Sequence, residues 1–229
     1  TTNANNKINS TEVPINASAK YLAEKLSTDL SGTGVSVSAK TRILLGPFKS
    51  GTSGDINFKL TGKNNDPLSI NATIDANDIS ALAKAINQYS SQTGLKAINT
   101  SDFDQLIIES EDGHDISFTE ISAPSDFNIF SLDEDFNKIS NALSIDVSST
   151  DKVSAYIKGN IKFTSSQSFN NQIDSGSIIS ASQNSLDGGY IDVSLNSSGE
   201  NAKIKPVIFN QLDNNLSDPN GKKAIVGLS

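Results

Sequence analysis

The sequence predicts an α+β fold that is rich in β-structure, with short amphipathic helices packed on antiparallel sheets in two subdomains. Apolar residues occur in short alternating runs separated by Asn, Ser, Gly and Asp, which is the pattern of many half-buried strands. Only a few short segments space their apolar residues as a helix does. The chain of 229 residues is long enough for two domains of roughly 100 residues each.

Two helices are predicted in the first half of the chain. Ser18 is the expected N-cap of the first helix, which ends at the sequence SGTG of residues 31–34. Asn77 or Asp78 is the expected cap of the second helix, which ends at Gly94. The apolar stripes consist of Ala19, Leu22, Ala23, Leu26 and Leu30 in the first helix, and of Ile79, Leu82, Ala83 and Ile86 in the second.

Alternating apolar residues predict the strands around these helices. The runs at 56–60 and 68–74 flank a turn of Asn, Asp and Pro, which predicts a hairpin. The turn 111–114 is expected to join two further strands as another hairpin. The strands predicted in this half span 35–39, 56–60, 68–74, 106–109 and 116–118.

The second half is predicted to be mostly β-structure. Ser131 and Glu134 have the spacing of a capping box, which predicts a third short helix. Strands are expected at 145–147, 161–163, 191–195 and 207–209, with turns at 187–189 and 218–221. The predicted organisation is a linker at 1–11, a first domain at 12–122 and a second domain at 125–229.

An internal duplication is the most informative feature of the sequence. At an offset of 60 residues, the first helix stripe aligns with the second, and Thr33-Gly34 aligns with Thr93-Gly94. Upstream, Ile15-Asn16-Ala17 aligns with Ile70-Asn71-Ala72 at an offset of 55. The copies span about 15–39 and 70–97. We expect their helices to bury matching faces under a shared sheet, with Gly34 and Gly94 in a backbone conformation that a Cβ would penalise.

Both copies resemble the short repeat of the variable outer region of bacterial flagellins, which also occurs in some flagellar cap and hook-associated proteins. The second copy is the better match, and further similar segments lie between and after the copies. The segments that carry the resemblance are SAKYLAEKL at 18–26, TGVSVSAKT at 33–41, DINFKLTG at 55–62, LSINAT at 68–73, DISALAKAIN at 78–87, TGLKA at 93–97 and LIIESEDGHDI at 106–116. Residues 12–122 are covered well, whereas 125–229 match only through GNIKFTSS at 159–166.

The resemblance implies a structural domain that projects from the flagellar filament outside the cell and takes part in motility. Its implied partners are neighbouring flagellin subunits, and exposed Ser or Thr residues would carry O-linked glycans. The long terminal helices that polymerise flagellin are missing, so we expect the isolated chain to be monomeric. The residues expected to matter are the buried Leu22, Leu26, Phe58, Ile70, Leu82 and Ile86.

Composition excludes several other classes. A net charge of −8 and a pI of about 4.6 argue against nucleic acid and membrane surfaces as partners. The lack of Cys excludes a disulfide scaffold, a zinc–thiolate site and a Cys nucleophile. No apolar run approaches the roughly 20 residues of a membrane span. No Met and no signal peptide begin the sequence, so we expect a mature fragment or an excised domain.

No catalytic, cofactor or metal site is predicted. His114 is the only His, and neither a zinc-protease helix motif nor a nucleophile elbow is present. Glu111, Asp112, His114 and Asp115 could hold a cation weakly, but a solvated turn is the favoured interpretation. The segment 213–221 has the composition of a calcium loop without its terminal Glu, so a plain turn is favoured there as well.

The alternative function is a binding module, either a cap or hook-associated protein domain or an adhesin that recognises glycans. Tyr190 between Asp187 and Asp192 is the local candidate for a lectin site, although strand packing explains it equally well. The Asn-x-Ser/Thr sequences at Asn16, Asn71 and Asn196 are interpreted as consequences of composition.

Overall fold

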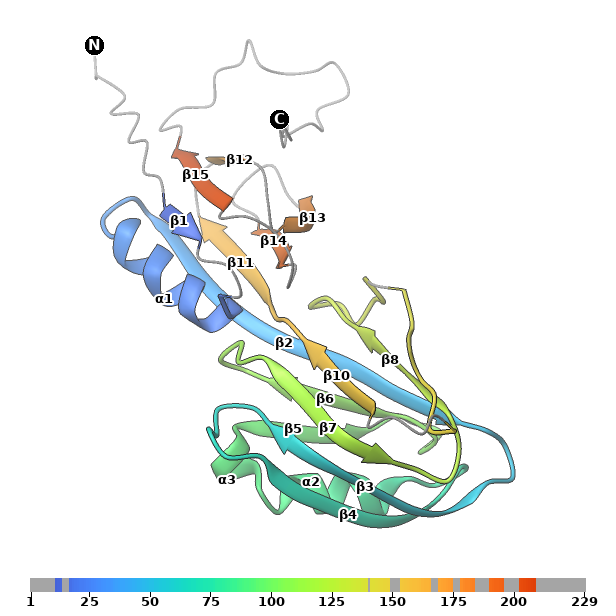
Figure 1. Ribbon diagram of the computed structural model, residues 1–229. Helices are drawn as coiled ribbons and strands as arrows, with labels where there is room; N and C mark the ends of the chain where they lie inside the picture. Colours follow the sequence, from blue (N-terminus) through green and yellow to red (C-terminus); the bar gives the residue numbers. More distant parts are fainter. Residues whose placement is uncertain are drawn as a thin grey trace, which may run out of the picture. The chain divides into compact units, whose positions relative to one another are not determined.

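A computed structural model describes most of the chain, and Figure 1 labels all of its helices and strands except β9. The described residues are 11–13, 17–139, 141–148, 153–165, 169–174, 178–183, 190–195 and 202–208. Side chains are described for 17–139, 141–148 and 153–165. The described strands pair antiparallel, and the helices are short, so the predicted α+β, β-rich class is confirmed.

The chain divides into two compact units. One unit consists of residues Lys40–Gly159, and the other of Thr1–Ala39 together with Asn160–Ser229. The sequence instead suggested a division near residue 124. The difference arises because strands beyond that position pair with strands before it: β8 (Phe127–Ser131) pairs with β2 (Val35–Phe48), and β10 (Val153–Ile157) pairs with β7 (Ile116–Ser122).

The unit of residues 40–159 is built from two antiparallel sheets. In the first sheet the order is β10, β7, β3 and β4, and in the second it is β9, β8, β2, β6 and β5. The further strands are β3 (Ser53–Thr61), β4 (Leu68–Asp75), β5 (Leu95–Asn99), β6 (Leu106–Ser110) and β9 (Leu143–Ile145). The predicted hairpin is the pair β3–β4, which is in register from Ser53↔Asp75 to Leu60↔Leu68.

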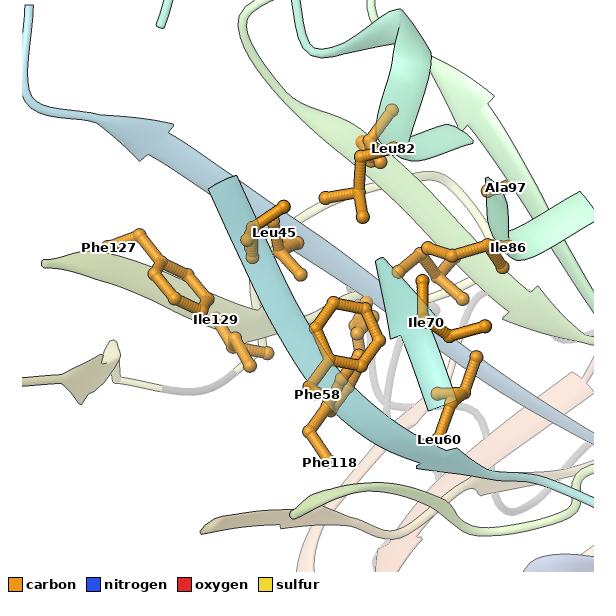
Figure 2. Packing of buried hydrophobic residues seen from close by; sticks show 14 of the residues in the cluster. Leu45, Phe58, Leu60, Ile70, Leu82, Ile86, Ala97, Phe118, Phe127 and Ile129 are labelled. Carbon is orange, nitrogen blue, oxygen red and sulfur yellow. The ribbon is translucent and has the colours of Figure 1, made fainter. Parts of the chain in front are cut away.

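One hydrophobic core lies between these sheets (Figure 2). It forms because alternate residues of each strand point inward, as in Ile56, Phe58 and Leu60 of β3. The ring of Phe58 meets that of Phe118 edge to face, with centroids 5.2 Å apart. Each aliphatic or aromatic side chain buried in this way contributes about 1.5–3 kcal/mol through the loss of apolar contact with water.

Helix α2 (Ser80–Asn87) contacts both β4 and β5, which are the terminal strands of the two sheets. Its residues Leu82 and Ile86 are fully buried and point toward Ile70 and Leu45 in Figure 2. The short helix α3 (Ser90–Thr93) follows and leads into β5. Helix α2 therefore covers one open side of the sandwich with the stripe that its sequence predicts.

The start of α2 differs from the prediction. Its N-cap is Ile79, and no side chain caps that position. The N–H of Ile79 donates to the carbonyl of Phe103 at 2.9 Å, and the Asp78 carboxylate accepts from the N–H of Ser80 at 2.9 Å. Asp78, the residue before the N-cap, thus accepts from the first N–H of the helix, while the N–H of Ile79 bonds to a loop carbonyl.

Helix α1 (Ala19–Asp29) begins as predicted. The Ser18 hydroxyl accepts a hydrogen bond from the N–H of Tyr21 at 3.1 Å, so Ser18 is confirmed as the N-cap. Helix α1 contacts β11 (Asn160–Ser165) and β1 (Thr11–Val13), and its Leu22 and Leu26 are fully buried. The two predicted helix copies therefore lie in different compact units and cover different strands.

The remaining strands of the unit of α1 form two pairings. Strand β15 pairs with β1 and β12, while β14 pairs with β11 and β13. Their bounds are β12 (Phe169–Asp174), β13 (Ile178–Gln183), β14 (Tyr190–Leu195) and β15 (Ala202–Ile208). The predicted turns at 187–189 and 218–221, and residues 1–10 of the predicted linker, lie outside the described residues; Thr11 belongs to β1.

Two local predictions are wrong. No helix begins at Ser131, because Ser131 ends β8 and Leu132 forms a β-bridge with Lys138. The Asp133 carboxylate accepts from the N–H groups of Asp135 and Asn137, which folds the segment into turns instead. The turn at 111–114 is not a hairpin, because it leads from β6 in one sheet to β7 in the other.

Candidate functional site

The Thr-Gly turn is built in a similar way in both copies of the repeat, although the accepting carbonyl lies four residues before the Thr in the second copy and three residues before it in the first. The Thr93 hydroxyl donates to the carbonyl of Tyr89 at 3.0 Å and accepts from the N–H of Leu95 at 3.2 Å. The Thr33 hydroxyl likewise donates to the carbonyl of Leu30 and accepts from the N–H of Val35 at 3.4 Å. In both copies this hydroxyl joins the end of the helical segment to the start of the next strand.

The glycine after each Thr has a left-handed backbone. The φ angle is 79° at Gly34 and 67° at Gly94, a region that a residue with a Cβ enters at a cost. The predicted reason for glycine at both positions is therefore confirmed, and the Thr-Gly turn recurs in structure as well as in sequence.

A second pair of contacts joins each helix to its strand. The side-chain amide of Asn87 donates to the carbonyl of Ala97 and accepts from the N–H of Ala97, both at 2.8 Å. At the aligned position, the Ser27 hydroxyl donates to the carbonyl of Val37 at 3.3 Å. Sequence reasoning missed these bonds, although the offset of 60 aligns both partners and could have suggested a shared role.

A buried ion pair lies beside the repeat. Arg42, the only arginine of the sequence, contacts Glu109 with its Nε at 3.1 Å and with its second terminal nitrogen at 3.0 Å. Their side chains are only 8% and 7% exposed. Loss of one partner from such a pair costs about 3–5 kcal/mol, because the other charge stays buried.

Arg42 also organises the segment that the sequence assigned to a helix. One of its terminal nitrogens donates to the carbonyls of Asp133 and Glu134, at 3.1 and 3.0 Å. The Phe136 ring lies 4.0 Å from the guanidinium carbon, in cation–π contact. This anchoring explains why the capping box at Ser131 is overridden.

Two carboxylates of the acidic turn, which the sequence offered as a weak cation site, form ion pairs with lysine side chains. Glu111 pairs with Lys40, and Asp115 with Lys158, both at 2.8 Å. The hydrogen bond from Lys40 lowers the pKa of Glu111, whereas burial raises the pKa of Asp115 despite Lys158. These carboxylates point to separate ammonium groups, and His114 ties the turn to the Ser110 hydroxyl through its backbone N–H at 3.1 Å.

The described residues bring together no group of three or more His, Cys, Asp or Glu side chains able to hold a metal ion. Asp187 and the segment 213–221 lie outside the described residues, and the side chain of Tyr190 is not described. Among the Asn-x-Ser/Thr positions named above, Asn71 is exposed on β4, while Asn16 and Asn196 lie outside the described residues. Within the described segments, the helices lack the length and apolar character that crossing a membrane requires.

The described geometry defines a β-rich structural domain. The polar side chains described above form hydrogen bonds to backbone groups and ion pairs with one another. Residues 55–112, which run from β3 through α2 to the turn after β6, match the family described as the flagellin hook IN motif. This stretch of the chain therefore matches the IN motif of flagellins, and the resemblance to flagellins drawn from the sequence is confirmed there. Flagellins are structural proteins of the bacterial flagellum.

Comparison with other proteins adds little to this match. No curated protein matches the chain. The crystal structure of the D2-D3 domains of the flagellar cap protein FliD from Escherichia coli is similar at 14% identity, covering 88% of this chain and 98% of that one, with a TM-score of 0.27. The D1-D2-D3 structure of the same protein gives 14% identity and a TM-score of 0.28, covering 88% of this chain and 55% of that one. Scores this low carry no argument.

Proposed function

We propose that this chain is the outer, surface-exposed part of a flagellin, which projects from the flagellar filament outside the cell. The observation that carries the proposal is the IN motif at 55–112, a stretch that contains the second and better copy of the repeat. The filament surface is then the site of action, and neighbouring flagellin subunits are the partners.

The described surface supports a mechanical and interfacial role. Lys and acidic side chains pair with one another at Lys40–Glu111 and Lys59–Glu120, and exposed pairs of this kind stabilise little but keep the surface hydrophilic. The core is closed by α2 and holds its shape through aliphatic packing. Exposed Ser and Thr residues are the proposed carriers of O-linked glycans.

The alternatives are a flagellar cap protein, a hook-associated protein and a glycan-binding adhesin. They differ from a flagellin in location: a flagellin repeats along the whole filament, a cap protein occurs at its tip, and a hook-associated protein occurs at the junction with the hook. The location of this chain on intact flagella therefore separates them.

A single introduced thiol makes that location visible. Residues 1–229 contain no Cys, and Asp112 is exposed, so Asp112→Cys in the full gene product adds a thiol at one defined position of this region for a thiol-reactive gold label. We expect label along the whole filament by electron microscopy, and none on flagella of the unsubstituted parent strain. Label confined to the tip or to the hook junction would overturn the flagellin assignment in favour of the corresponding alternative.

A further inference from the structure

The unit of residues 40–159 is an insertion in the chain. The chain enters it at Lys40, leaves it at Gly159 and then resumes the other unit. Strand β2 carries the entry and β10 leads to the exit, and these two strands belong to different sheets. The turn 111–115 joins β6, the partner of β2, to β7, the partner of β10. One short turn therefore serves both ends of the insertion.

The entry is joined to the turn by an ion pair. The ladder of β2 and β6 ends at Thr41↔Ser110. One residue farther along both strands, Lys40 Nζ lies 2.8 Å from Glu111 Oε2. The Glu111 side chain is 64% exposed, so water screens this pair, and alone it stabilises little.

The exit is joined to the same turn in the same way. The ladder of β7 and β10 ends at Ile116↔Ile157, and one residue farther Lys158 Nζ lies 2.8 Å from Asp115 Oδ2. The Lys158 side chain is only 15% exposed. The other oxygen of Asp115, Oδ1, is buried and has no hydrogen-bond partner among the described residues. Lys158 is thus needed to compensate a partly buried charge.

Ser110 fixes the turn between the two pairs. Its carbonyl accepts from the N–H of Gly113 at 3.2 Å, and its hydroxyl accepts from the N–H of His114 at 3.1 Å. Ser110 is itself fully buried. The backbone is therefore held from the residue before Glu111 to the residue before Asp115, so a shift at one carboxylate is passed to the other.

We infer that the turn 111–115 is a clasp that couples the entry and the exit of this unit, so that release of one ion pair weakens the other. Two independent pairs would each hold one end of the insertion, and loss of one would leave the other unchanged. Coupling is therefore the property that distinguishes a clasp from two ordinary surface contacts. The inference concerns the unit itself and does not depend on the place of the chain in the flagellum.

A double-mutant cycle in the full chain tests the coupling. Lys40→Gln and Lys158→Gln each remove one ammonium group, and native-state hydrogen exchange of the β7 amides gives the equilibrium constant for opening the unit. We expect the double variant to raise this constant by less than the product of the two single effects, with a shortfall of about threefold or more. A smaller shortfall, or none, overturns the inference.

Lys59→Gln is the matched control. Lys59 pairs with Glu120 at 2.7 Å in the same unit, on strands β3 and β7, outside the turn. Its loss changes the net charge as the other two substitutions do, so it measures the general effect of removing a lysine. The effects of Lys59→Gln and Lys40→Gln should multiply, and a shortfall as large as that of the clasp would contradict a device specific to the turn.

Two further variants complete the test. Ser110→Ala removes the hydroxyl that holds the turn and should lower the coupling between Lys40 and Lys158; undiminished coupling would show that the turn does not carry it. Asp115→Asn takes the place of Lys158→Gln if that variant fails to fold, because it removes the buried charge together with the ion pair. The same threefold shortfall then decides the inference.

Discussion

The two copies of the repeat share their turn but differ in how the helix holds the strand. In both, a Thr hydroxyl bridges helix and strand and a glycine follows with a positive φ. In the second copy the side chain at the end of the helix makes two bonds of 2.8 Å to one strand residue, whereas in the first copy it makes one bond of 3.3 Å.

This difference shows which contacts of the repeat depend on neighbouring residues alone and which depend on the surrounding fold. The Thr-Gly turn depends only on its own sequence, so it recurs wherever that sequence does. The helix-to-strand bond depends on whether the strand edge has another partner. Strand β5 is the last in its sheet, so the side chain must satisfy both backbone groups of Ala97.

The buried helix stripes should give the largest effects. Leu26 and Ile86 align in the repeat, and both are fully buried. Leu26→Ala and Ile86→Ala should each lower the free energy of unfolding by about 2–5 kcal/mol, because each leaves a cavity in a packed core. Denaturant unfolding measures the loss, and hydrogen exchange should locate it in the unit that holds the substituted helix. A loss below about 1 kcal/mol for either variant would contradict its role in the core.

The helix-to-strand bonds should rank next. Asn87→Ala should cost about 1–3 kcal/mol, and Ser27→Ala about 0.5–1 kcal/mol, because the first removes two short hydrogen bonds and the second a single long one. Ser27→Asn sharpens the comparison, since it gives the first copy the amide of the second. Equal costs for the two alanine variants in urea unfolding would show that the copies do not differ as described.

The two glycines should behave alike. Gly34→Ala and Gly94→Ala should each destabilise by about 1–2 kcal/mol, because both need a left-handed backbone. An added Cβ meets nothing within 4 Å at Gly34 and lies 3.0 Å from the flexible Lys63 side chain at Gly94, so sterics add little. Replacement by Asn, which tolerates this conformation, should cost less at both positions. Thermal unfolding of the four variants measures these losses of stability. An Ala variant as stable as the wild type would show that the left-handed conformation is not required at that glycine.

The smallest expected effect is a difference in pH response between the helix starts. The N–H of Ser80 bonds to the Asp78 carboxylate and lowers its pKa from the ordinary value of 3.8. This contribution is present above pH 3.8 and is lost as the pH falls through the lowered pKa. Ser18 does not titrate in this range, so α1 should start normally in acid.

Amide chemical shifts of Ser80 and Tyr21 report this difference directly. Ser80 should titrate with Asp78 while Tyr21 stays constant, and Asp78→Asn should abolish the response of Ser80. A wild-type Ser80 signal that does not change below pH 3.8 would rule out the bond to Asp78.

Local patterns made much of the fold predictable. The Ser18 cap, the hairpin β3–β4 and the conformations of Gly34 and Gly94 follow from neighbouring residues alone, and the structure confirms them. The same holds for the apolar stripes, because helical periodicity selects the face that is buried.

Contacts between residues far apart in the sequence account for the features of the fold that local patterns did not predict. The capping box at Ser131 is a sound local pattern, but Arg42, which lies 91 residues before Asp133, takes the carbonyls of that segment. The Arg42–Glu109 pair itself joins residues 67 positions apart. The division into units likewise depends on β8 and β10 pairing back across the expected boundary, which no local pattern specifies.

The most direct test of this account is the hydrogen exchange of the Ala97 amide in the wild-type chain, measured by NMR. A side-chain amide that replaces a neighbouring strand should protect this edge-facing N–H far beyond the exchange rate of an unstructured peptide, and Asn87→Ala should remove that protection. Exchange of the wild-type Ala97 N–H at the unstructured rate would show that the edge of β5 is open, and would contradict the distinction drawn between the two copies.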